Sequence, residues 1–224
     1  MPHSVEAHLR LQVTDYDRII RTFIPGYEAM LETIVRSLGL VLPPDGRLID
    51  LGGGTGSLAY LIAERFPNAI IEIWDIDRKM LAVAKQRLST FGDRILFVER
   101  SFNESLPSCN AVVACIALHH LRTLEKKKQV YTNIFNALPP DGIFLNGDAT
   151  MSSDPKLREG TYSLWSEFMK STGMSDEEVS KHFRNWSEED TYFSLAEELS
   201  ALGGVGFRNV ECFWKYGPMT VYGG

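Results

Sequence analysis

The sequence predicts a doubly wound α/β fold, with a mostly parallel seven-stranded sheet that ends in an antiparallel hairpin. Three observations support this prediction. A short apolar run passes into glycines and then into a helical pattern over residues 47–66. Short apolar runs then alternate with amphipathic helical segments, which is typical of a parallel sheet with helical crossovers. Two further strand patterns occupy residues 206–223 and are joined by the turn Tyr216-Gly217-Pro218.

The glycine-rich turn is the segment around which the rest of the chain is organised. Residues 47–51 form an apolar strand pattern that leads directly into residues 52–56, Gly-Gly-Gly-Thr-Gly. Glycine adopts positive φ without steric cost and lets another molecule approach the backbone closely. We therefore expect this turn to form the floor of a nucleotide-like site. The third glycine of the dinucleotide fingerprint would lie where Ser57 stands, which favours a ligand without a pyrophosphate.

An acidic residue follows the next strand. Residues 69–74 predict a second strand that ends at Asp75, about twenty positions past the glycines, where a carboxylate accepts hydrogen bonds from ribose hydroxyls. Asp77 is the rival, but it stands where the N-cap of the next helix is expected. We therefore assign the ribose contact to Asp75 and the capping role to Asp77. Met80 is among the apolar residues of that helix that are expected to face the sheet.

The later strands bring candidate catalytic side chains to the edge of the sheet. Residues 111–116 are apolar throughout, as expected for a parallel strand covered on both faces, and they lead to His119 and His120. The strand predicted over residues 143–147 leaves Asp148 at the same edge. Imidazole titrates near neutral pH, so either histidine is a candidate general base, and Asp148 is a third candidate. The alternative is that one histidine is structural and the other only lines a pocket.

Helical segments on either side of the core are expected to cover the site. Residues 1–46 are assigned as an N-terminal helical lid, and residues 151–191 as an insertion of two helices. The aromatic side chains of this insertion either pack in a core or face an organic substrate. Residues 47–150 make up the core of a single domain, and residues 192–224 complete it. The last helix of the chain is expected to stop at Gly203-Gly204.

Composition and charge restrict the class of protein. A formal net charge of −6 argues against nucleic-acid or anionic-membrane binding, which requires clustered Lys and Arg. Cys109, Cys115 and Cys212 show no metal-ligand spacing, so neither a disulfide framework nor a zinc site is predicted, and we expect no metal. No apolar run reaches membrane-spanning length, and the first residues lack a signal-peptide pattern. We expect a cytoplasmic protein, either a monomer or a homodimer.

Taken together, these segments resemble the class I S-adenosylmethionine (SAM) methyltransferases that act on small molecules. Residues 48–56 (Leu-Ile-Asp-Leu-Gly-Gly-Gly-Thr-Gly) are similar to the first motif of that superfamily, and residues 74–77 to the second. Residues 118–121 (Leu-His-His-Leu) are similar to a sequence motif that is common in its members. The terminal hairpin is a feature of their Rossmann-like fold. The resemblance spans residues 16–224. It implies transfer of the SAM methyl group to an O, N or C atom of a small organic acceptor, with S-adenosylhomocysteine (SAH) as product.

The resemblance also implies which residues hold the cofactor. Tyr27 of a Pro-Gly-Tyr segment is expected to touch it, and Cys115 to lie beneath it. After the third strand, the superfamily usually has an acidic residue beside adenine, but Ser101 and Phe102 stand there in this chain. Adenine recognition is then expected to use the Ser101 hydroxyl, backbone N–H groups and the Phe102 ring. The complete set predicted to bind SAM is Tyr27, Asp50, Gly52, Gly53, Gly54, Gly56, Asp75, Ile76, Met80, Ser101, Phe102 and Cys115.

Other functions remain open at this point. Pro25-Gly26-Tyr27 and the stretch from residues 173–178 to Gly206-Phe207 also resemble carboxy-SAM synthases, for which SAM and prephenate are the assay substrates. Those enzymes use an arginine in the second inserted helix to hold the extra carboxylate. Phe183 stands at the matching position, with Arg184 about 100° further round the helix. A non-catalytic SAM-binding module is a third possibility. A nicotinamide-dependent oxidoreductase conflicts with Ser57 and with the terminal hairpin.

Overall fold

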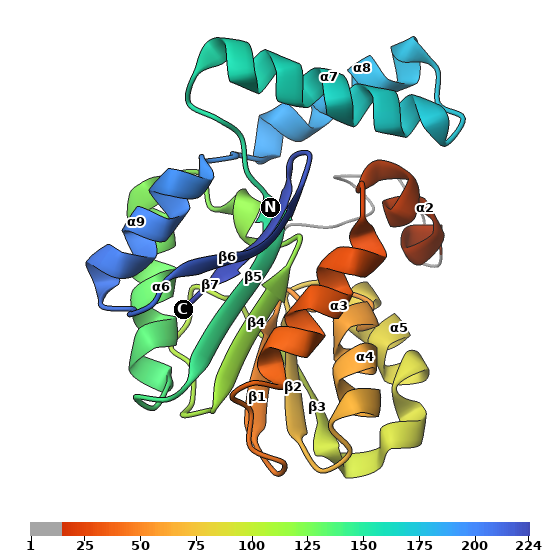
Figure 1. Cartoon of the computed structure of the whole chain (residues 1–224). Coiled ribbons are helices and arrows are strands. Elements are labelled where there is room, and N and C mark those ends of the chain that lie inside the picture. Colours follow the sequence, from red (N-terminus) through yellow and green to blue (C-terminus); the bar gives the residue numbers. More distant parts are fainter. Residues whose placement is uncertain (1–14) are drawn as a thin grey trace.

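A seven-stranded mixed sheet lies at the centre of the computed structural model, with the strand order β3-β2-β1-β4-β5-β7-β6 (Figure 1). The strands are β1 Arg47–Leu51, β2 Ile70–Asp75, β3 Ile95–Glu99, β4 Ala111–Cys115, β5 Ile143–Ala149, β6 Glu211–Tyr216 and β7 Met219–Gly223. Strands β1 to β5 pair in parallel, whereas β7 pairs antiparallel with both β5 and β6. The predicted fold class is confirmed, including the antiparallel hairpin.

The structure describes residues 15–224, so residues 1–14 of the predicted N-terminal lid lie outside the described residues. The described α-helices are α2 Tyr16–Phe23, α3 Tyr27–Leu38, α4 Ser57–Arg65, α5 Arg78–Arg87, α6 Leu124–Ala137, α7 Pro155–Ser171, α8 Asp176–Glu189 and α9 Leu195–Val205. Helices α3, α4 and α5 contribute to one apolar core, and α6 and α9 contribute to a second. The sheet is therefore covered on both faces, which explains why the central strand β4 is apolar throughout.

The carboxyl ends of the parallel strands meet along one edge of the sheet. Leu51 at the end of β1 pairs with Trp74 on one side and with Ala114 on the other. The strand order reverses between β1 and β4, because β2 and β3 extend in one direction and β4 and β5 in the other. Such a switch point opens a crevice beyond the strand ends. The glycine turn after β1 therefore borders the crevice in which a ligand is expected.

Helices from two distant parts of the chain close over this edge (Figure 1). Trp165 of α7 donates its Nε1–H to the backbone carbonyl of Phe23 in α2, with a distance of 2.6 Å. The Phe23 ring packs edge-on against Trp186 of α8, with 5.2 Å between ring centroids. Several aromatic side chains of the insertion therefore hold α2 and the inserted helices together above the crevice.

Two predicted boundaries near the C-terminal end are wrong. Helix α9 does not stop at Gly203-Gly204 but runs through them to Val205, and β6 begins at Glu211 rather than near Gly206. Ala201 and Leu202 are buried in the second core, so tertiary packing offsets the helix penalty of about 1 kcal/mol for each glycine. The helix ends instead at Gly206, whose φ of 126° is suited to glycine.

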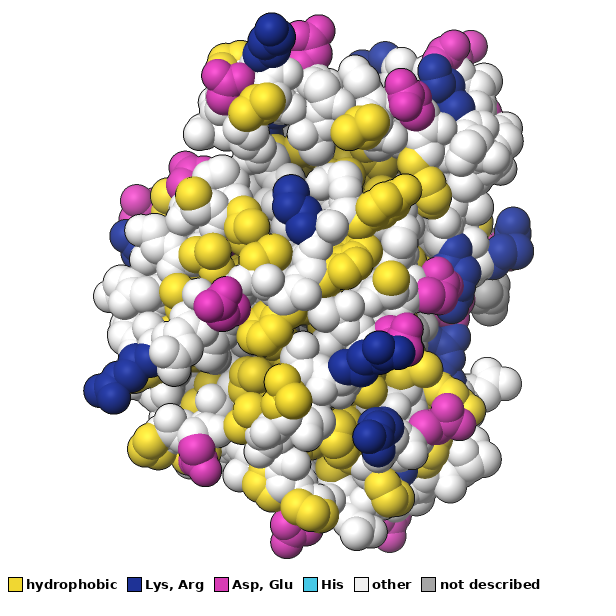
Figure 2. All heavy atoms as spheres, viewed as in Figure 1, with side chains coloured by type: hydrophobic (Ala, Val, Ile, Leu, Met, Phe, Trp, Pro, Cys, Tyr) yellow, Lys and Arg dark blue, Asp and Glu magenta, His cyan; other side chains and the backbone are white. Residues whose placement is uncertain are grey.

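The charges on the surface and the apolar character of the helices indicate whether nucleic acid or a membrane could be a partner. The face shown in Figure 2 mixes Lys and Arg with Asp and Glu, so it presents no basic stripe of the kind that nucleic-acid binding requires. Among the helices of the described residues, none combines the length and the apolar character needed to cross a membrane.

Candidate active site

Three adjoining cavities lie at the carboxyl edge of the sheet, and Tyr16 of α2 lines all of them. The turn cavity, of about 310 Å³, lies beside residues 52–55. The strand-end cavity, of about 1440 Å³, lies beside Asp75 at the end of β2. The lid cavity, of about 550 Å³, lies beside His119 and is bordered by α2 and the inserted helices. Ile116 lines both the strand-end and the lid cavity, so these two cavities adjoin.

The glycine turn shapes the boundary between the turn and strand-end cavities. Gly52 and Gly54 have φ values of 67° and 57° and line both cavities. A Cβ on Gly52 would lie 2.5 Å from Cβ of Ala117, and a Cβ on Gly53 would lie 2.9 Å from a carboxylate oxygen of Asp50. Larger residues therefore cannot replace these glycines without moving the turn.

Gly56, which is also predicted to bind the cofactor, has different surroundings. It lines none of the three cavities and instead forms the N-cap of α4, with a φ of 77°. A Cβ there would lie 2.8 Å from the Leu88 side chain. Gly56 is therefore required by helix packing, and the sequence pattern could not separate this need from close approach to a ligand.

Asp50 places a buried carboxylate in the turn cavity. Its side chain is 1% exposed, and neither carboxylate oxygen has a hydrogen-bond partner among the described residues. Burial, with a further contribution from the charge of Asp75, raises the pKa of Asp50 to about 7. Leaving a buried carboxylate without a partner costs free energy, so this arrangement favours a ligand that brings a cationic or hydrogen-bond-donating group to Asp50.

Asp75 and Asp77 have different surroundings, and the capping role predicted for Asp77 is confirmed. Asp75 lines the strand-end cavity and accepts hydrogen bonds from the backbone N–H groups of Gly54, at 2.9 Å, and Asp77, at 2.8 Å. Each carboxylate oxygen keeps a second lone pair for a ligand hydroxyl. Burial raises the pKa of Asp75 despite these hydrogen bonds. Asp77 accepts from the backbone N–H of Lys79 at 2.9 Å and caps α5.

The other predicted cofactor residues are divided between the same two cavities. Tyr27 and Cys115 line the turn cavity, where burial raises the pKa of both side chains above their usual ranges. The residues on the strand-end cavity are Ile76, Met80, Ser101 and Phe102. Arg100 also lines the strand-end cavity, with its guanidinium 5.5 Å from the centroid of the Trp74 ring. Sequence reasoning missed Arg100, although it directly precedes Ser101.

Asp17 fastens helix α2 to the glycine turn. Its carboxylate accepts hydrogen bonds from the hydroxyls of Thr55, at 2.6 Å, and Ser57, at 2.8 Å, and pairs with the guanidinium of Arg87. Burial alone would raise the pKa of Asp17, but these hydrogen bonds and the charge of Arg87 lower it. The neighbouring Tyr16 is thereby held where the three cavities meet. The role of Asp17 was not predicted, because its partners lie far away in the sequence.

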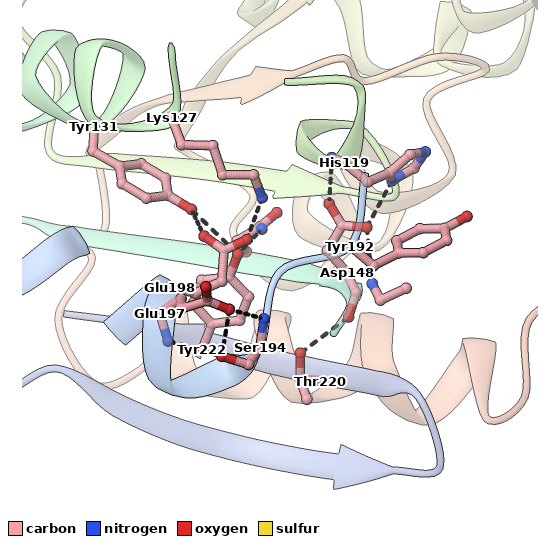
Figure 3. Close-up of polar contacts among 12 residues, drawn as sticks. His119, Lys127, Tyr131, Asp148, Tyr192, Ser194, Glu197, Glu198, Thr220 and Tyr222 are labelled. Carbon is pink, nitrogen blue, oxygen red and sulfur yellow. Dashed lines mark hydrogen bonds and ion pairs between the residues drawn. The ribbon is translucent and has the colours of Figure 1, made fainter. Parts of the chain in front are cut away.

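The lid cavity has one polar end, where His119 is oriented by Asp148 (Figure 3). The Nδ1 atom of His119 lies 2.7 Å from Oδ1 of Asp148, and the His119 backbone N–H donates to Oδ2 at 3.0 Å. Burial would lower the pKa of His119, but the charges of Asp148 and Asp190 raise it on balance. Burial would raise the pKa of Asp148, but the charge of His119 lowers it. All three predicted catalytic residues, His119, His120 and Asp148, line this cavity.

Asp190 and Tyr192 complete the polar end, and sequence reasoning missed both. Oδ1 of Asp190 lies 3.0 Å from Nδ1 of His120 and 3.9 Å from Nε2 of His119. Tyr192 donates its hydroxyl to Oδ2 of Asp190 at 2.9 Å. The rest of the lining is mostly aliphatic and aromatic and contains no Lys or Arg within the described residues. The cavity therefore suits a small, largely apolar molecule with a polar group at one end.

Ile116 occupies a strained position at the junction of the strand-end and lid cavities. Its φ is 50°, in the left-handed region, which costs a β-branched residue roughly 1–2 kcal/mol. Its backbone N–H donates to the carbonyl of Gly147 at 2.8 Å, which helps to hold the strained conformation. Backbone strain of this kind concentrates at functional sites, so the position of Ile116 agrees with that of the cavities.

Comparisons with known proteins agree with this geometry. Residues 49–144 match a family model described as a methyltransferase domain. The carboxy-S-adenosyl-L-methionine synthase of Nautilia profundicola is 23% identical over 208 residues, covering 92% of this chain and 88% of that protein. The protein of the same name from Helicobacter pylori is 26% identical over 218 residues, again covering 92% and 88%.

Solved structures extend the likeness to the three-dimensional fold. Human N-acetylserotonin methyltransferase in complex with SAM has a TM-score of 0.62 at 21% identity, and covers 88% of this chain. PigF with SAH has a TM-score of 0.66 at 22% identity, and covers 95% of this chain. The present chain spans 51% and 58% of the lengths of those two proteins. Sheet order, domain match and structural likeness agree: the chain has the fold of class I SAM-dependent methyltransferases, with a methyltransferase domain over residues 49–144.

Proposed function

We propose that this enzyme transfers the methyl group of SAM to an O, N or C atom of a small organic acceptor held in the lid cavity. The observation that carries the proposal is the meeting of three cavities at Tyr16, with Ile116 at the junction of the strand-end and lid cavities. A SAM molecule lying across the turn and strand-end cavities brings its sulfonium centre to this junction. The acceptor then approaches from the lid cavity.

The residues of the first two cavities fit the two ends of SAM. The amino-acid end fits the turn cavity, where the α-ammonium group supplies the cationic partner that the Asp50 carboxylate lacks among the described residues. The adenosine fits the strand-end cavity, where Asp75 can accept hydrogen bonds from the ribose hydroxyls. Gly52 and Gly54 let the ligand cross between the cavities close to the backbone.

The lid cavity supplies alignment and a dry environment for the acceptor. SAM brings a methyl carbon that is already electrophilic, so the protein mainly needs to align the acceptor atom and exclude water. Phe23, Trp165 and Trp186 line the cavity and enclose an acceptor with apolar surface. The polar end beside His119 and His120 orients the polar group of the acceptor and accepts its proton where one must leave. The residues named here all belong to one chain, so the proposal applies to a monomer or a homodimer.

A carboxy-SAM synthase is the second candidate, because the curated relatives bear that name. The lid cavity supports methyl transfer instead. Phe183, at the position of the expected arginine, packs its ring against Trp165 at 5.4 Å and Tyr162 at 5.2 Å. Arg184 is exposed, and no Lys or Arg of the described residues lines the lid cavity. A carboxylate bound there would have no guanidinium or ammonium partner.

Product analysis by mass spectrometry tests the proposal. Purified enzyme is incubated with SAM and pools of small aromatic and enolisable metabolites, and with SAM and prephenate in a parallel reaction. We expect SAH together with an acceptor that has gained one methyl group. A carboxylated SAM in the prephenate reaction, with no methylated product elsewhere, would establish the second candidate. Tight binding of SAM without turnover in any pool would instead indicate a non-catalytic SAM-binding module.

A further inference from the structure

We propose that His119, His120 and Asp190 form a binding site for a divalent transition-metal ion at the polar end of the lid cavity. One ligand atom from each residue lies within 4.8 Å of the other two, and no other group of three His, Cys, Asp or Glu residues within 15–224 does so. All three residues line the lid cavity. The site stands on this geometry alone, whereas its role toward the acceptor rests on the proposed function.

The spacing of the ligand atoms is close to that of a coordination sphere. With metal–ligand bonds of about 2.1 Å, neighbouring ligand atoms lie roughly 3.0–3.4 Å apart. Oδ1 of Asp190 lies 3.0 Å from Nδ1 of His120, which fits directly, and 3.9 Å from Nε2 of His119. The ligand atoms of the two imidazoles lie within 4.8 Å of each other, so the His119 ring would have to move towards both other ligands to complete the set.

The partners of His119 prepare its Nε2 atom for coordination. Nδ1 lies 2.7 Å from the Asp148 carboxylate, which also accepts the backbone N–H of His119. An Nδ1–H donated to this carboxylate places the lone pair of the ring on Nε2, the atom that faces Asp190. Histidine ligands of metal ions almost always carry a carboxylate, carbonyl or water on the other ring nitrogen, which fixes the tautomer and raises ligand basicity.

Asp190 is oriented in a comparable way. Tyr192 donates its hydroxyl to Oδ2, so Oδ1 is the oxygen that faces both imidazoles. The Tyr192 ring packs 5.8 Å from Trp165 and 5.8 Å from His119, which limits movement of the hydroxyl. The carboxylate is therefore held by a neighbour that is itself packed, as expected for the supporting residues of a metal site.

Charge and ligand chemistry define the class of ion. The polar end holds two buried carboxylates, Asp148 and Asp190, and no Lys or Arg of the described residues lines the cavity. The buried Lys127 is paired with Glu198. A divalent cation balances the two carboxylates while both imidazoles stay neutral. Two nitrogens and one carboxylate oxygen suit Zn²⁺, Fe²⁺, Co²⁺ or Mn²⁺, whereas Mg²⁺ and Ca²⁺ prefer sites made of oxygen atoms.

The position of the site suggests how it serves the proposed reaction. Its three ligands line one end of the cavity, so the remaining coordination positions face the acceptor. With the ion bound, the two imidazoles would be ligands and the ion would take over their part in deprotonation. A phenol or enol oxygen bound to it would lose its proton more readily, to water that leaves as the acceptor enters. An acceptor lone pair then forms the new bond to the methyl carbon, and the electron pair of the breaking C–S bond stays on sulfur to give SAH.

Metal binding can be measured without SAM or an acceptor. Untagged protein is stripped with EDTA, dialysed and titrated with Zn²⁺ by calorimetry, with elemental mass spectrometry of the bound metal and Mg²⁺ as the comparison ion. We expect one Zn²⁺ per chain and a visible d–d spectrum with Co²⁺. His120→Ala and Asp190→Asn should each abolish stoichiometric binding. His182→Ala is the matched control, since His182 packs against Phe23, lines no part of the lid cavity and should leave binding unchanged.

The variants separate a metal site from a merely structural cluster. Asp148→Asn should weaken Zn²⁺ binding roughly 10–100-fold and still give a Co²⁺ spectrum, because Asp148 positions His119 without binding the ion. Circular dichroism and SAH binding show whether Asp190→Asn and Asp148→Asn are folded. The proposed site would be overturned if the wild-type protein bound well below one equivalent of Zn²⁺. It would also be overturned if folded Asp190→Asn bound as much Zn²⁺ as the wild-type protein. Methyl transfer that persists in EDTA would overturn its role in the reaction but leave the proposed function intact.

Discussion

Asp17 and Arg87 form an ion pair that joins the first described helix to the helix after β2, across the glycine turn. The same carboxylate accepts hydrogen bonds from Thr55 and Ser57, on either side of the last glycine of the turn. This pair couples the lid to the turn, because the residue next to Asp17 is Tyr16, which lines all three cavities. The position of the lid thus depends on a contact made at the predicted cofactor site.

The first prediction concerns this coupling. Asp17→Ala should weaken SAM binding by about 1–3 kcal/mol, because it leaves Arg87 and two hydroxyls without their shared acceptor. Calorimetric titration with SAM measures the loss. Asp15→Ala is the matched control, since Asp15 pairs with the exposed Arg18 on the same end of the chain and should change the affinity little. Equal losses in the two variants would mean that Asp17 has no special role.

The second prediction separates the two acidic residues after β2. Asp75→Ala should weaken SAM binding by about 1–3 kcal/mol, because ribose hydroxyls would lose their acceptor. Asp77→Ala should lower the free energy of unfolding by about 1 kcal/mol through loss of the α5 cap, with SAM affinity nearly retained. Calorimetry and urea denaturation of both variants measure these effects. The opposite pattern would show that the two roles are exchanged.

The third prediction follows from the raised pKa of Asp50. With a pKa of about 7 in the SAM-free protein, Asp50 is protonated below neutral pH, whereas the ammonium group of SAM favours the carboxylate. SAM binding should therefore release a proton, and affinity should fall up to tenfold per pH unit below about pH 7. Calorimetry in buffers of different ionisation enthalpy measures both effects. Asp50→Asn should bind SAM weakly and without this pH dependence.

The raised pKa of Asp50 also makes the free energy of unfolding depend on pH. In the SAM-free protein the folded state holds the Asp50 proton up to about pH 7, whereas the unfolded chain loses it near its usual pKa of 3.8. The free energy of unfolding should therefore fall as pH rises between those values, because the native state binds the extra proton. Urea denaturation of Asp50→Asn should show a smaller decrease over that interval. An identical pH profile in the variant would contradict the raised pKa.

Local patterns in the sequence explain how much of the site could be predicted. The glycine turn, Asp75 and the His119-His120 pair each directly follow an apolar strand, and the carboxyl ends of parallel strands meet at one edge. Their convergence follows from the fold class alone. The sequence could not separate Gly56 from the glycines that line the cavities, because positive φ, helix packing and close ligand approach all select glycine.

The remaining site residues depend on tertiary packing. Asp190 and Tyr192 follow α8 and reach His119 only because the insertion folds back over the sheet edge. Asp17 meets its partners through the docking of α2. In the sequence these are ordinary polar residues near helix ends, so no periodicity or spacing marks them. The residues that build the proposed metal site and couple the lid to the turn are those that local patterns do not reveal.

The fourth prediction tests the glycine turn itself. Gly54→Val should abolish SAM binding, because the side chain would project between the turn and strand-end cavities from a residue with φ of 57°. Gly92→Val is the control for backbone strain, since Gly92 also has a positive φ, of 65° with ψ of −152°, and a Cβ on it would meet no atom within 4 Å. Both variants should lose stability from backbone strain, by roughly 1–3 kcal/mol. Only Gly54→Val should lose affinity, and normal binding by the folded variant would refute the assignment.

The fifth prediction concerns a buried polar network between helices α6 and α9 (Figure 3). Glu198 of α9 pairs with Lys127 and accepts the Tyr131 hydroxyl at 2.6 Å, and the ion-pair side chains are only 1% and 2% exposed. Glu198→Ala would leave the Lys127 charge buried and unpaired, which should cost about 3–5 kcal/mol in urea denaturation. The double variant Lys127→Met/Glu198→Leu should recover most of that loss, since it removes both charges. Because neither Glu198 nor Lys127 lines a cavity of the site, the double variant should retain its affinity for SAM.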